Sequence, residues 1–280
     1  MIRWMIALAF TLLTLVGCQE TPPVGGKNRP KAYTSAVSLS PSTTELIASY
    51  FINLQLVGRT AACNYPDQIK TAPVMGSVKP DFEKIVAAKP SVVFVDKSLY
   101  GDAEIQKLKD LKLDVIVMDV KTVKEFCTFL QLTAGKVGSE MDVNNSVDKI
   151  VNAYENASSQ PGEKRKIMIL LGDTNSEYMV AGLKTFQADL MRGTGYELVG
   201  PDAEKFQTMP VEQLIGLAPD VIITTGDPMT VFKDPRLQSM GAIKNRRIIK
   251  IDADSLLRAG SRVERILNDL RPAVEGLYKQ

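Results

Sequence analysis

The sequence predicts an α/β protein with two three-layer α/β lobes joined by a single long helix. Two observations predict this class. Strand-like and helix-like segments alternate along the chain, and one uninterrupted amphipathic segment near the middle divides it into halves of similar plan. The chain has 280 residues, of which 45% are hydrophobic and 24% are charged. This composition is ordinary for a globular protein, and the length suffices for two domains.

The first 31 residues have the composition of an export signal followed by a spacer. Arg3 precedes an apolar run from Trp4 to Val16 that is shorter than the roughly 20 residues needed to span a membrane. We therefore expect residues 1–17 to be a signal peptide. The segment ending at Cys18 resembles a bacterial lipobox, in which the cysteine is acylated, and an incidental Cys behind a plain secretory signal is the alternative. Residues 18–31, rich in Pro and Gly, are expected to form a tether.

Charge and residue content exclude several classes of function. The net charge of +2 gives no reason to expect binding of nucleic acid, which needs concentrated basic surface. The sequence contains no His, which excludes Ser-His-Asp and Cys-His nucleophiles and His-ligated zinc or copper. We expect no cofactor and no metal site. Cys63 and Cys127 either pair in an oxidising compartment or remain as two buried thiols.

The first half of the chain alternates strands and helices. Residues 36–39 form a strand that runs into a helix, for which Ser42 and Glu45 match a capping box. Such a strand-to-helix junction presents backbone N–H groups where open α/β sheets bind ligands, although every βα unit has one. The further expected strands are 56–59, 92–95 and 115–118, and the further helices are 81–88 (N-cap Asp81), 102–111 and one opening at Thr122 with Glu125 as capping partner.

An amphipathic helix is expected between the two halves. Met141, Val147, Ile150, Val151 and Tyr154 recur at helical spacing, and neither Gly nor Pro interrupts residues 139–158. The expected organisation is an N-terminal lobe at 32–138, a connecting helix at 139–160 and a C-terminal lobe at 161–280.

The second half repeats the plan of the first. Residues 82–95 align without a gap with residues 211–224, an offset of 129 because 211 minus 82 is 129. A helix, a Pro and an apolar strand coincide, although short matches of this kind are common in α/β proteins. The other expected elements are a strand at 166–171, an apolar segment at 178–181, a helix at 184–192, a strand at 247–251 and a final helix at 262–278.

One acid occupies the same place in the first turn of each repeated helix, Glu83 in the first half and Glu212 in the second. An acid there stabilises the helix dipole by about 0.3 to 1 kcal/mol. Alternatively, two acids at equivalent places form a paired docking surface for a basic partner. The residues alone leave both interpretations open.

A set of short motifs occurs in a fixed order from Ala32 to the end of the chain. They are Leu39-Ser40-Pro41-Ser42-Thr43-Thr44-Glu45-Leu46, Leu56-Val57-Gly58, Cys63-Asn64-Tyr65-Pro66, Glu83-Lys84-Ile85-Val86 with Lys89-Pro90, Ala181-Gly182, Glu212-Gln213 with Ala218-Pro219-Asp220, and Arg258-Ala259-Gly260-Ser261-Arg262. This order resembles the helical-backbone (class III) solute-binding proteins of ABC importers, most closely the vitamin B12-binding branch. Siderophore-binding and haem-binding relatives share much of it.

The resemblance implies a receptor that holds its ligand between two lobes joined by one rather rigid helix. It also implies that Glu83 and Glu212 meet arginines of the permease. The expected function is capture of cobalamin or a related corrinoid for an ABC permease and its ATPase, by a monomer anchored outside the cytoplasm through Cys18. An iron-siderophore or haem carrier of the same fold is the alternative.

The chain departs from the B12 branch where aromatic residues are usual. Ala62 occupies a position that is usually aromatic in that branch, and Asn64 occupies one that is usually Asp. The aromatic pair that is usual near Ser255 and Leu256 is also absent. Tyr65, Tyr100 and Tyr178 are candidate substitutes. Loops that follow strand ends are expected to face the ligand, at 40–42, 62–65, 77–79, 173–178, 225–227 and 254–258. The candidate ligand residues are Ser40, Pro41, Ser42, Ala62, Cys63, Asn64, Tyr65, Val78, Lys79, Tyr178, Thr225, Gly226, Leu256 and Arg258.

Two other classes of function compete with transport. An extracytoplasmic enzyme on the same frame would need a cluster of carboxylates in the cleft, and no pair of acids in the sequence has a spacing that brings it together. A binding subunit that feeds a sensor complex would keep the cleft but lack permease and ATPase genes beside it. We expect no catalytic residues.

Overall fold

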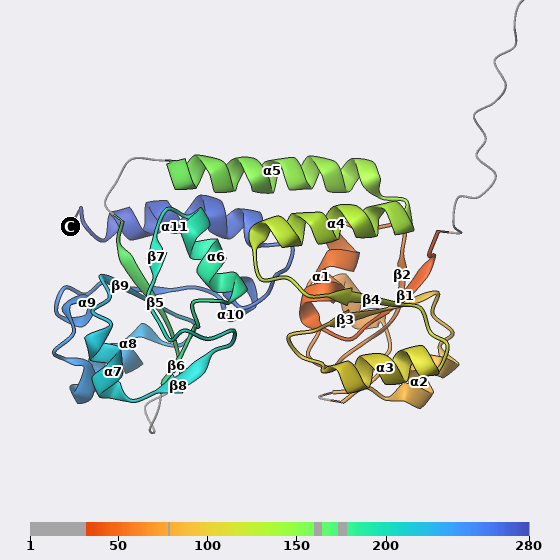
Figure 1. Ribbon diagram of the computed structural model, residues 1–280, viewed down its shortest axis with the longest axis horizontal. Coiled ribbons are helices and arrows are strands. Elements are labelled where there is room, and N and C mark those ends of the chain that lie inside the picture. The colour runs from red at the N-terminus through yellow and green to blue at the C-terminus, as the bar shows by residue number, and fades with distance from the viewer. Residues whose placement is uncertain (1–31, 78, 160–163, 173–177, 280) are drawn as a thin grey trace, which may run out of the picture. The chain divides into compact units, whose positions relative to one another are not determined.

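The computed structural model describes residues 32–77, 79–159, 164–172 and 178–279. The predicted signal peptide, the tether and Cys18 therefore lie outside the described residues. Two lobes, each built on its own sheet, lie side by side beneath one long helix (Figure 1). The fold class expected from the sequence is confirmed.

The N-terminal lobe begins at the first strand and alternates strands with helices, as the sequence predicts. Its strands are parallel and the two central ones are largely buried, so both faces of the sheet must be covered by helices. Its elements are β1 (Ser35–Ser38), α1 (Pro41–Ser49), β2 (Gln55–Arg59), the 3-10 helix η1 (Asp67–Thr71), α2 (Phe82–Ala87), β3 (Val92–Asp96), α3 (Asp102–Asp110), β4 (Val115–Met118) and α4 (Val123–Val137).

The N-terminal sheet has the order β2-β1-β3-β4 with all neighbours parallel. Successive residues of β3 point to opposite faces, so Phe94 packs with α1 and α4 on one side while Val93 packs with α2 and α3 on the other. The Phe94 ring stacks on Phe51 with centroids 6.0 Å apart. The lobe therefore has three layers, and the carboxyl ends of its four strands share one edge.

Two of the predicted helix starts in this lobe are confirmed and one is wrong. Thr122 and Glu125 form the predicted capping box of α4, and Asp81 caps α2 by accepting from Lys84 N at 3.1 Å. In α1, however, the N-cap is Ser40, whose hydroxyl accepts from Thr43 N at 3.1 Å. Ser42 lies inside this helix because Pro41 fits its first position. The Glu45 side chain is thus free for another partner.

The connecting helix α5 (Glu140–Ser159) follows α4 after a turn at Gly138, whose φ of 71° only glycine adopts without strain. Its buried stripe consists of Val143, Val147, Ile150, Ala153 and Ala157. The expected apolar face was therefore partly wrong, since Met141 is 80% exposed and Val151 is 37% exposed. The small side chains at 153 and 157 let α5 lie close to its neighbours, which a count of large apolar residues overlooks.

The C-terminal lobe contains a six-stranded sheet with the path β10-β9-β5-β6-β8, and β7 also pairs with β5. Strands β5, β9 and β10 are parallel, whereas β6 is antiparallel to β5. The elements are β5 (Lys166–Leu171), β6 (Tyr178–Val180), α6 (Phe186–Gly193), β7 (Glu197–Leu198), β8 (Gln207–Met209), α7 (Val211–Gly216), β9 (Val221–Thr224), α8 (Pro228–Lys233), the 3-10 helix η2 (Pro235–Leu237), α9 (Gly241–Lys244), β10 (Ile248–Lys250), α10 (Ala253–Leu256) and α11 (Val263–Gly276).

The internal repeat is visible in the backbone. Adding the offset of 129 to the bounds of α2, 82 and 87, gives 211 and 216, which are the bounds of α7. Each helix is followed by a non-glycine residue with a left-handed backbone, Lys89 at φ 46° and Ala218 at φ 45°, and then by a Pro. Because residues other than Gly rarely adopt this conformation, its recurrence at equivalent places supports a common plan for the two lobes.

One hydrophobic core crosses from lobe to lobe. It contains Phe126 of α4, Ile150 of α5, Leu190 of α6 and Leu267 of α11, together with the inward faces of both sheets. In Figure 1, α5 runs along the top of both lobes, over α11 and α4. The far faces of the two sheets have separate cores, covered by α2 and α3 in one lobe and by α7, α8 and α9 in the other.

Cys63 and Cys127 are free, buried thiols, which decides between the two alternatives left open by the sequence. No helix in the described ranges has the length and apolar character needed to cross a bilayer.

Candidate functional site

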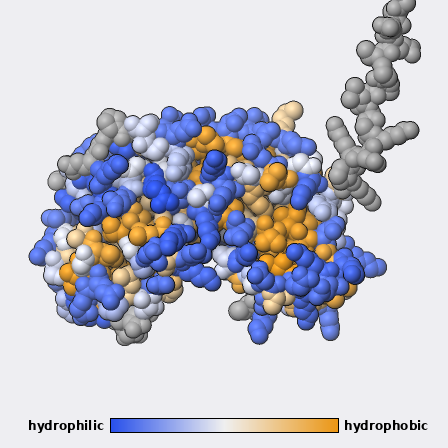
Figure 2. All heavy atoms as spheres, viewed as in Figure 1, coloured by the Kyte–Doolittle hydropathy of each residue, from blue (hydrophilic) through white to orange (hydrophobic). Residues whose placement is uncertain are grey.

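The candidate site lies where the carboxyl ends of the parallel strands of the two lobes approach each other. Loops after β1, β2 and β3 come from the N-terminal lobe, and loops after β9 and β10 come from the C-terminal lobe. Ligands of open α/β sheets bind at such edges. Figure 2 shows the surface indented between the two lobes at the lower edge of the view.

The loop from β1 to α1 forms buried structure at this edge. The Ser38 and Ser40 hydroxyls each bond Thr43 Oγ1, at 2.7 and 2.8 Å. Thr44 Oγ1 bonds both Ser38 Oγ at 2.8 Å and Cys63 Sγ at 3.1 Å. The predicted ligand residues Ser40, Ser42 and Cys63 are therefore at most 6% exposed, and Pro41 is half-buried. In this structure they build the support for the site.

Arg59 fixes the loop that carries the predicted residues 62–65. Its guanidinium donates to the carbonyls of Ile69, Thr60 and Cys63, each at 3.1 Å. Cys63 is thereby turned inward, while Ala62, Asn64 and Tyr65 are exposed. Arg59 was not singled out from the sequence, because a lone Arg at a strand end carries no recognisable pattern.

Asn64 and Arg258, both predicted as ligand residues, lie together and join the lobes. Arg258 Nη1 donates to Asn64 Oδ1 at 3.0 Å, and Asn64 Nδ2 donates to Asp254 Oδ2 at 2.8 Å. The guanidinium of Arg262 lies 4.6 Å from the centroid of the Tyr65 ring. The exposed tip of the N-terminal loop thus rests on the segment around α10.

Buried acids at this edge all have partners. Glu45 forms ion pairs with Arg258 and Arg262. Asp96, at the end of β3, accepts from Ser98 N at 3.0 Å and from Ser98 Oγ at 2.6 Å, and burial raises the pKa of its carboxyl. Glu45 and Asp96 were missed by sequence reasoning. The part of the chain that the structure describes contains no group of three or more His, Cys, Asp or Glu side chains suited to hold a metal ion.

Two predicted ligand residues of the C-terminal lobe are core residues. Tyr178 is fully buried and donates its hydroxyl to Asp234 Oδ2 at 2.7 Å. Burial, reinforced by this hydrogen bond, raises the pKa of Tyr178 to about 12, while the Arg236 guanidinium lowers the pKa of Asp234 to about 2. Leu256 is also fully buried. Neither side chain offers a surface to a ligand in this structure, so the expectation for both is corrected.

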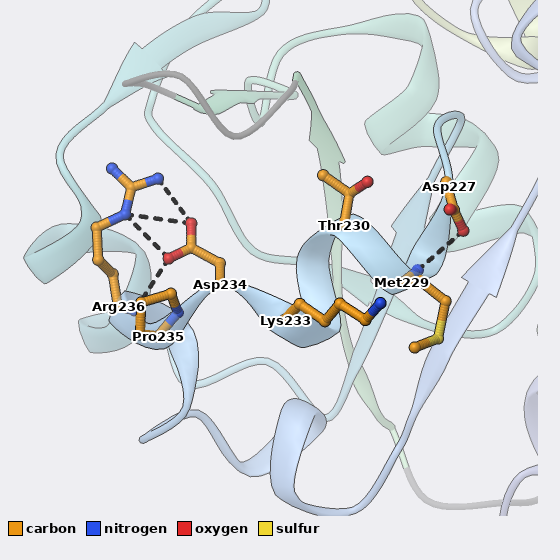
Figure 3. Close-up of a pocket in the computed structure, with 7 residues that line it drawn as sticks. All are labelled: Asp227, Met229, Thr230, Lys233, Asp234, Pro235 and Arg236. Atoms are coloured by element: carbon orange, nitrogen blue, oxygen red, sulfur yellow. Dashed lines mark hydrogen bonds and ion pairs between the residues drawn. The ribbon is translucent and has the colours of Figure 1, made fainter.

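A cavity of about 470 Å³ lies beside α8, lined by the Asp227–Arg236 segment (Figure 3). All its lining residues belong to the C-terminal lobe. Asp227 caps α8 by accepting from Met229 N at 3.0 Å, and Thr225 and Gly226 precede it. Thr225 is half-buried and Gly226 is exposed. Among the described residues, no hydrogen bond or ion pair links these two predicted ligand residues to Asn64 or Arg258.

The remaining predicted residues are only partly placed. Lys79 is exposed, whereas Val78 and residues 173–177 lie outside the described ranges. Glu83 and Glu212 are both exposed, in the first turns of α2 and α7.

Comparisons with known proteins identify the family and the fold. Residues 37–255 match the periplasmic binding protein family. The uncharacterized ABC transporter substrate-binding lipoprotein YvrC of Bacillus subtilis is 24% identical over 261 residues, covering 90% of this chain and 81% of that protein. The vitamin B12-binding protein of Salmonella typhimurium is 22% identical over 265 residues, covering 94% of this chain and 93% of that protein.

The fold also matches solved structures. The periplasmic heme-binding protein BhuT, in complex with two hemes, superposes with a TM-score of 0.76 at 18% identity, covering 87% of this chain and 98% of that chain. At this identity the likeness concerns the fold. The family match begins within β1, spans the connecting helix and ends within α10, which is more than half of the chain, so the chain belongs to the periplasmic binding protein family.

Proposed function

We propose that this protein is the substrate-binding lipoprotein of an ABC importer, which captures cobalamin or a related corrinoid between its lobes and delivers it to a permease. The observation that carries the proposal is the meeting of Asn64 with Asp254 and Arg258, and of Tyr65 with Arg262, across the two lobes. A ligand at this place would contact both lobes. The names of two relatives, a substrate-binding lipoprotein and a vitamin B12-binding protein, support it.

The polar groups at this meeting place suit a ligand rich in amides. Asp254 and the exposed Asn64 already bond each other and Arg258, but each of their oxygens can accept a second hydrogen bond, whereas the guanidiniums of Arg258 and Arg262 are engaged by carboxylates. Tyr65, 42% exposed, presents an aromatic ring to an apolar face of the ligand. Carboxamide side chains around a flat macrocycle match this combination, whereas an anionic chelate would find no uncommitted guanidinium there.

An iron-siderophore or haem carrier is the second candidate, favoured by the fold likeness to a heme-binding protein. The enzyme alternative is less supported, because Glu45, Asp252 and Asp254 each pair with arginine rather than standing together as an acid–base pair. We propose that the protein catalyses no reaction and acts as a monomer. Acylation at Cys18, followed by the tether, would hold it outside the cytoplasm at a membrane surface.

Calorimetric titration tests the ligand assignment. The panel is cyanocobalamin, dicyanocobinamide, haemin and a ferric hydroxamate siderophore, each titrated into protein that begins at residue 19. Calorimetry is preferred to tryptophan fluorescence because the only Trp of the sequence, Trp4, is in the predicted signal peptide and is absent from the titrated protein. We expect one equivalent of a corrinoid to bind, with haemin and the siderophore weaker. Binding of haemin or the siderophore alone would select the second candidate, and no binding by any probe would reject capture of a metal chelate.

A further inference from the structure

We infer that Glu45 is a positioning residue of the ligand site, which holds the two lobes and the proposed ligand loop in register without touching a ligand. The effect of Glu45 on ligand binding rests on the proposed function, whereas its effect on the position of the two lobes does not. Glu45 lies on α1 of the N-terminal lobe with its side chain 1% exposed. Both of its ion-pair partners, Arg258 and Arg262, belong to the C-terminal lobe.

The carboxylate of Glu45 is enclosed by the other lobe. Its Oε1 accepts from Arg258 Nη1 at 2.9 Å and from Arg262 Nη2 at 2.6 Å, and its Oε2 lies 3.4 Å from Arg262 Nε. A Cβ atom added to Gly260 would lie 2.6 Å from Oε2. The segment 258–262 therefore wraps closely around this acid, and a side chain at position 260 would displace the carboxylate.

The ion pairs of Arg258 and Arg262 differ from those of Glu45 in which lobe supplies the partner. Arg258 also pairs with Asp254, and Arg262 pairs with Asp252 at 3.0 Å, so the C-terminal lobe balances its own two arginines. Glu45 has no such partner within its own lobe among the described ion pairs. An unpaired buried carboxylate is strongly unfavourable. Separating the lobes here would break both ion pairs of Glu45, whereas Arg258 and Arg262 would each keep one within their own lobe.

The same two arginines hold the proposed ligand loop. Arg258 donates through Nη1 to both Glu45 and Asn64, and Arg262 lies against the ring of Tyr65. The buried carboxylate holds the two guanidiniums, which also contact Asn64 and Tyr65 at the exposed loop tip. Tyr50, at the end of α1, adds a bond from its hydroxyl to Ser261 O at 3.3 Å. The position of Asn64 and Tyr65 therefore depends on a residue that no ligand can reach.

Glu45→Gln tests the inference, since the amide keeps the shape but removes the charge. Spin labels are attached at Lys109→Cys on α3 and Lys244→Cys on α9, two exposed positions, and double electron–electron resonance measures the distance between them. The native Cys63 and Cys127 are buried and so are shielded from labelling. In Glu45→Gln we expect a broader, longer distance distribution and faster amide exchange at residues 61–65. For the probe that the wild type binds, we expect affinity to fall about 10-fold.

Glu155→Gln is the matched control, because this exposed acid on α5 has no side-chain ion pair or hydrogen bond among the described interactions. Glu45→Asp should recover part of the distance distribution, which a merely space-filling role would not predict. If Glu45→Gln does not fold, Arg258→Lys, which keeps the charge but loses the planar fork, should show the same changes to a smaller degree.

The outcomes separate the two proposals. Unchanged interlobe distances and loop exchange in the folded Glu45 and Arg258 variants would overturn the positioning role, whatever the ligand is. Failure of every probe to bind wild type would instead reject the proposed function, and the distance and exchange data would still decide the role of Glu45.

Discussion

Reversal of charge at both Glu83 and Glu212 is expected to reduce uptake of the bound ligand into cells by at least about 10-fold, because like charges brought together at an interface cost several kcal/mol. The two acids occupy equivalent turns of α2 and α7, and both are exposed. We propose that these acids, one on each lobe, form a two-point contact for a basic permease surface. Affinity for the ligand in solution should be unchanged, since neither acid contacts the residues around Asn64 and Arg258.

The measurement is uptake of the labelled ligand by cells that lack their own copy of the gene and express Glu83→Lys with Glu212→Lys. Glu140→Lys with Glu155→Lys is the matched control, because it changes the net charge equally at two exposed acids of α5. Uptake equal to wild type in the first double variant would show that these acids serve only their helix dipoles.

Phe126→Ala should lower the free energy of unfolding by about 3 to 5 kcal/mol, the usual cost of truncating a buried Phe. Phe126 is fully buried on α4 and lies in the core shared by the two lobes. Its ring meets Phe186 of α6 edge to face, with centroids 5.9 Å apart. Beside it, Asp189 of α6 accepts from Val123 N at 2.8 Å, so α4 is capped from the other lobe.

Urea denaturation measures this loss, with Phe129→Ala as the control. Phe129 is on the same helix but only partly buried, so its truncation should cost clearly less. Equal losses for the two variants would contradict a core that is continuous across the lobes at α4 and α6.

Much of the fold follows from local sequence signals. Alternating strands and helices, the Thr122 capping box and the Asp81 cap all describe interactions within a few residues of each other, which periodicity and capping rules detect. The repeat was found because a helix, a Pro and a strand recur at one spacing. The short strands β7 and β8 were missed because two or three residues carry no periodicity, and their pairing depends on β5 and β6.

The site was harder to predict, because its contacts join residues far apart in the sequence. The motifs indicate Asn64 and Arg258 separately. In the structure Arg258 Nη1 lies 3.0 Å from Asn64 Oδ1, although the two residues are 194 positions apart in the sequence. Tyr178 is an aromatic residue near a strand end, which predicts a ligand contact, but burial and the hydrogen bond to Asp234 make it a core residue. Glu45 was interpreted as a capping residue, since no local pattern indicates that a buried acid will meet two arginines more than 200 residues away.

We propose that the ligand contacts both lobes where the 60–66 loop meets α10. Amide hydrogen exchange, measured with and without saturating amounts of the probe that binds most tightly in calorimetry, tests it most directly. We expect exchange to slow at residues 61–66 and at residues 253–258 in the same experiment. Slowing confined to one lobe, or found only beside α8 around Asp227, would contradict binding between the lobes.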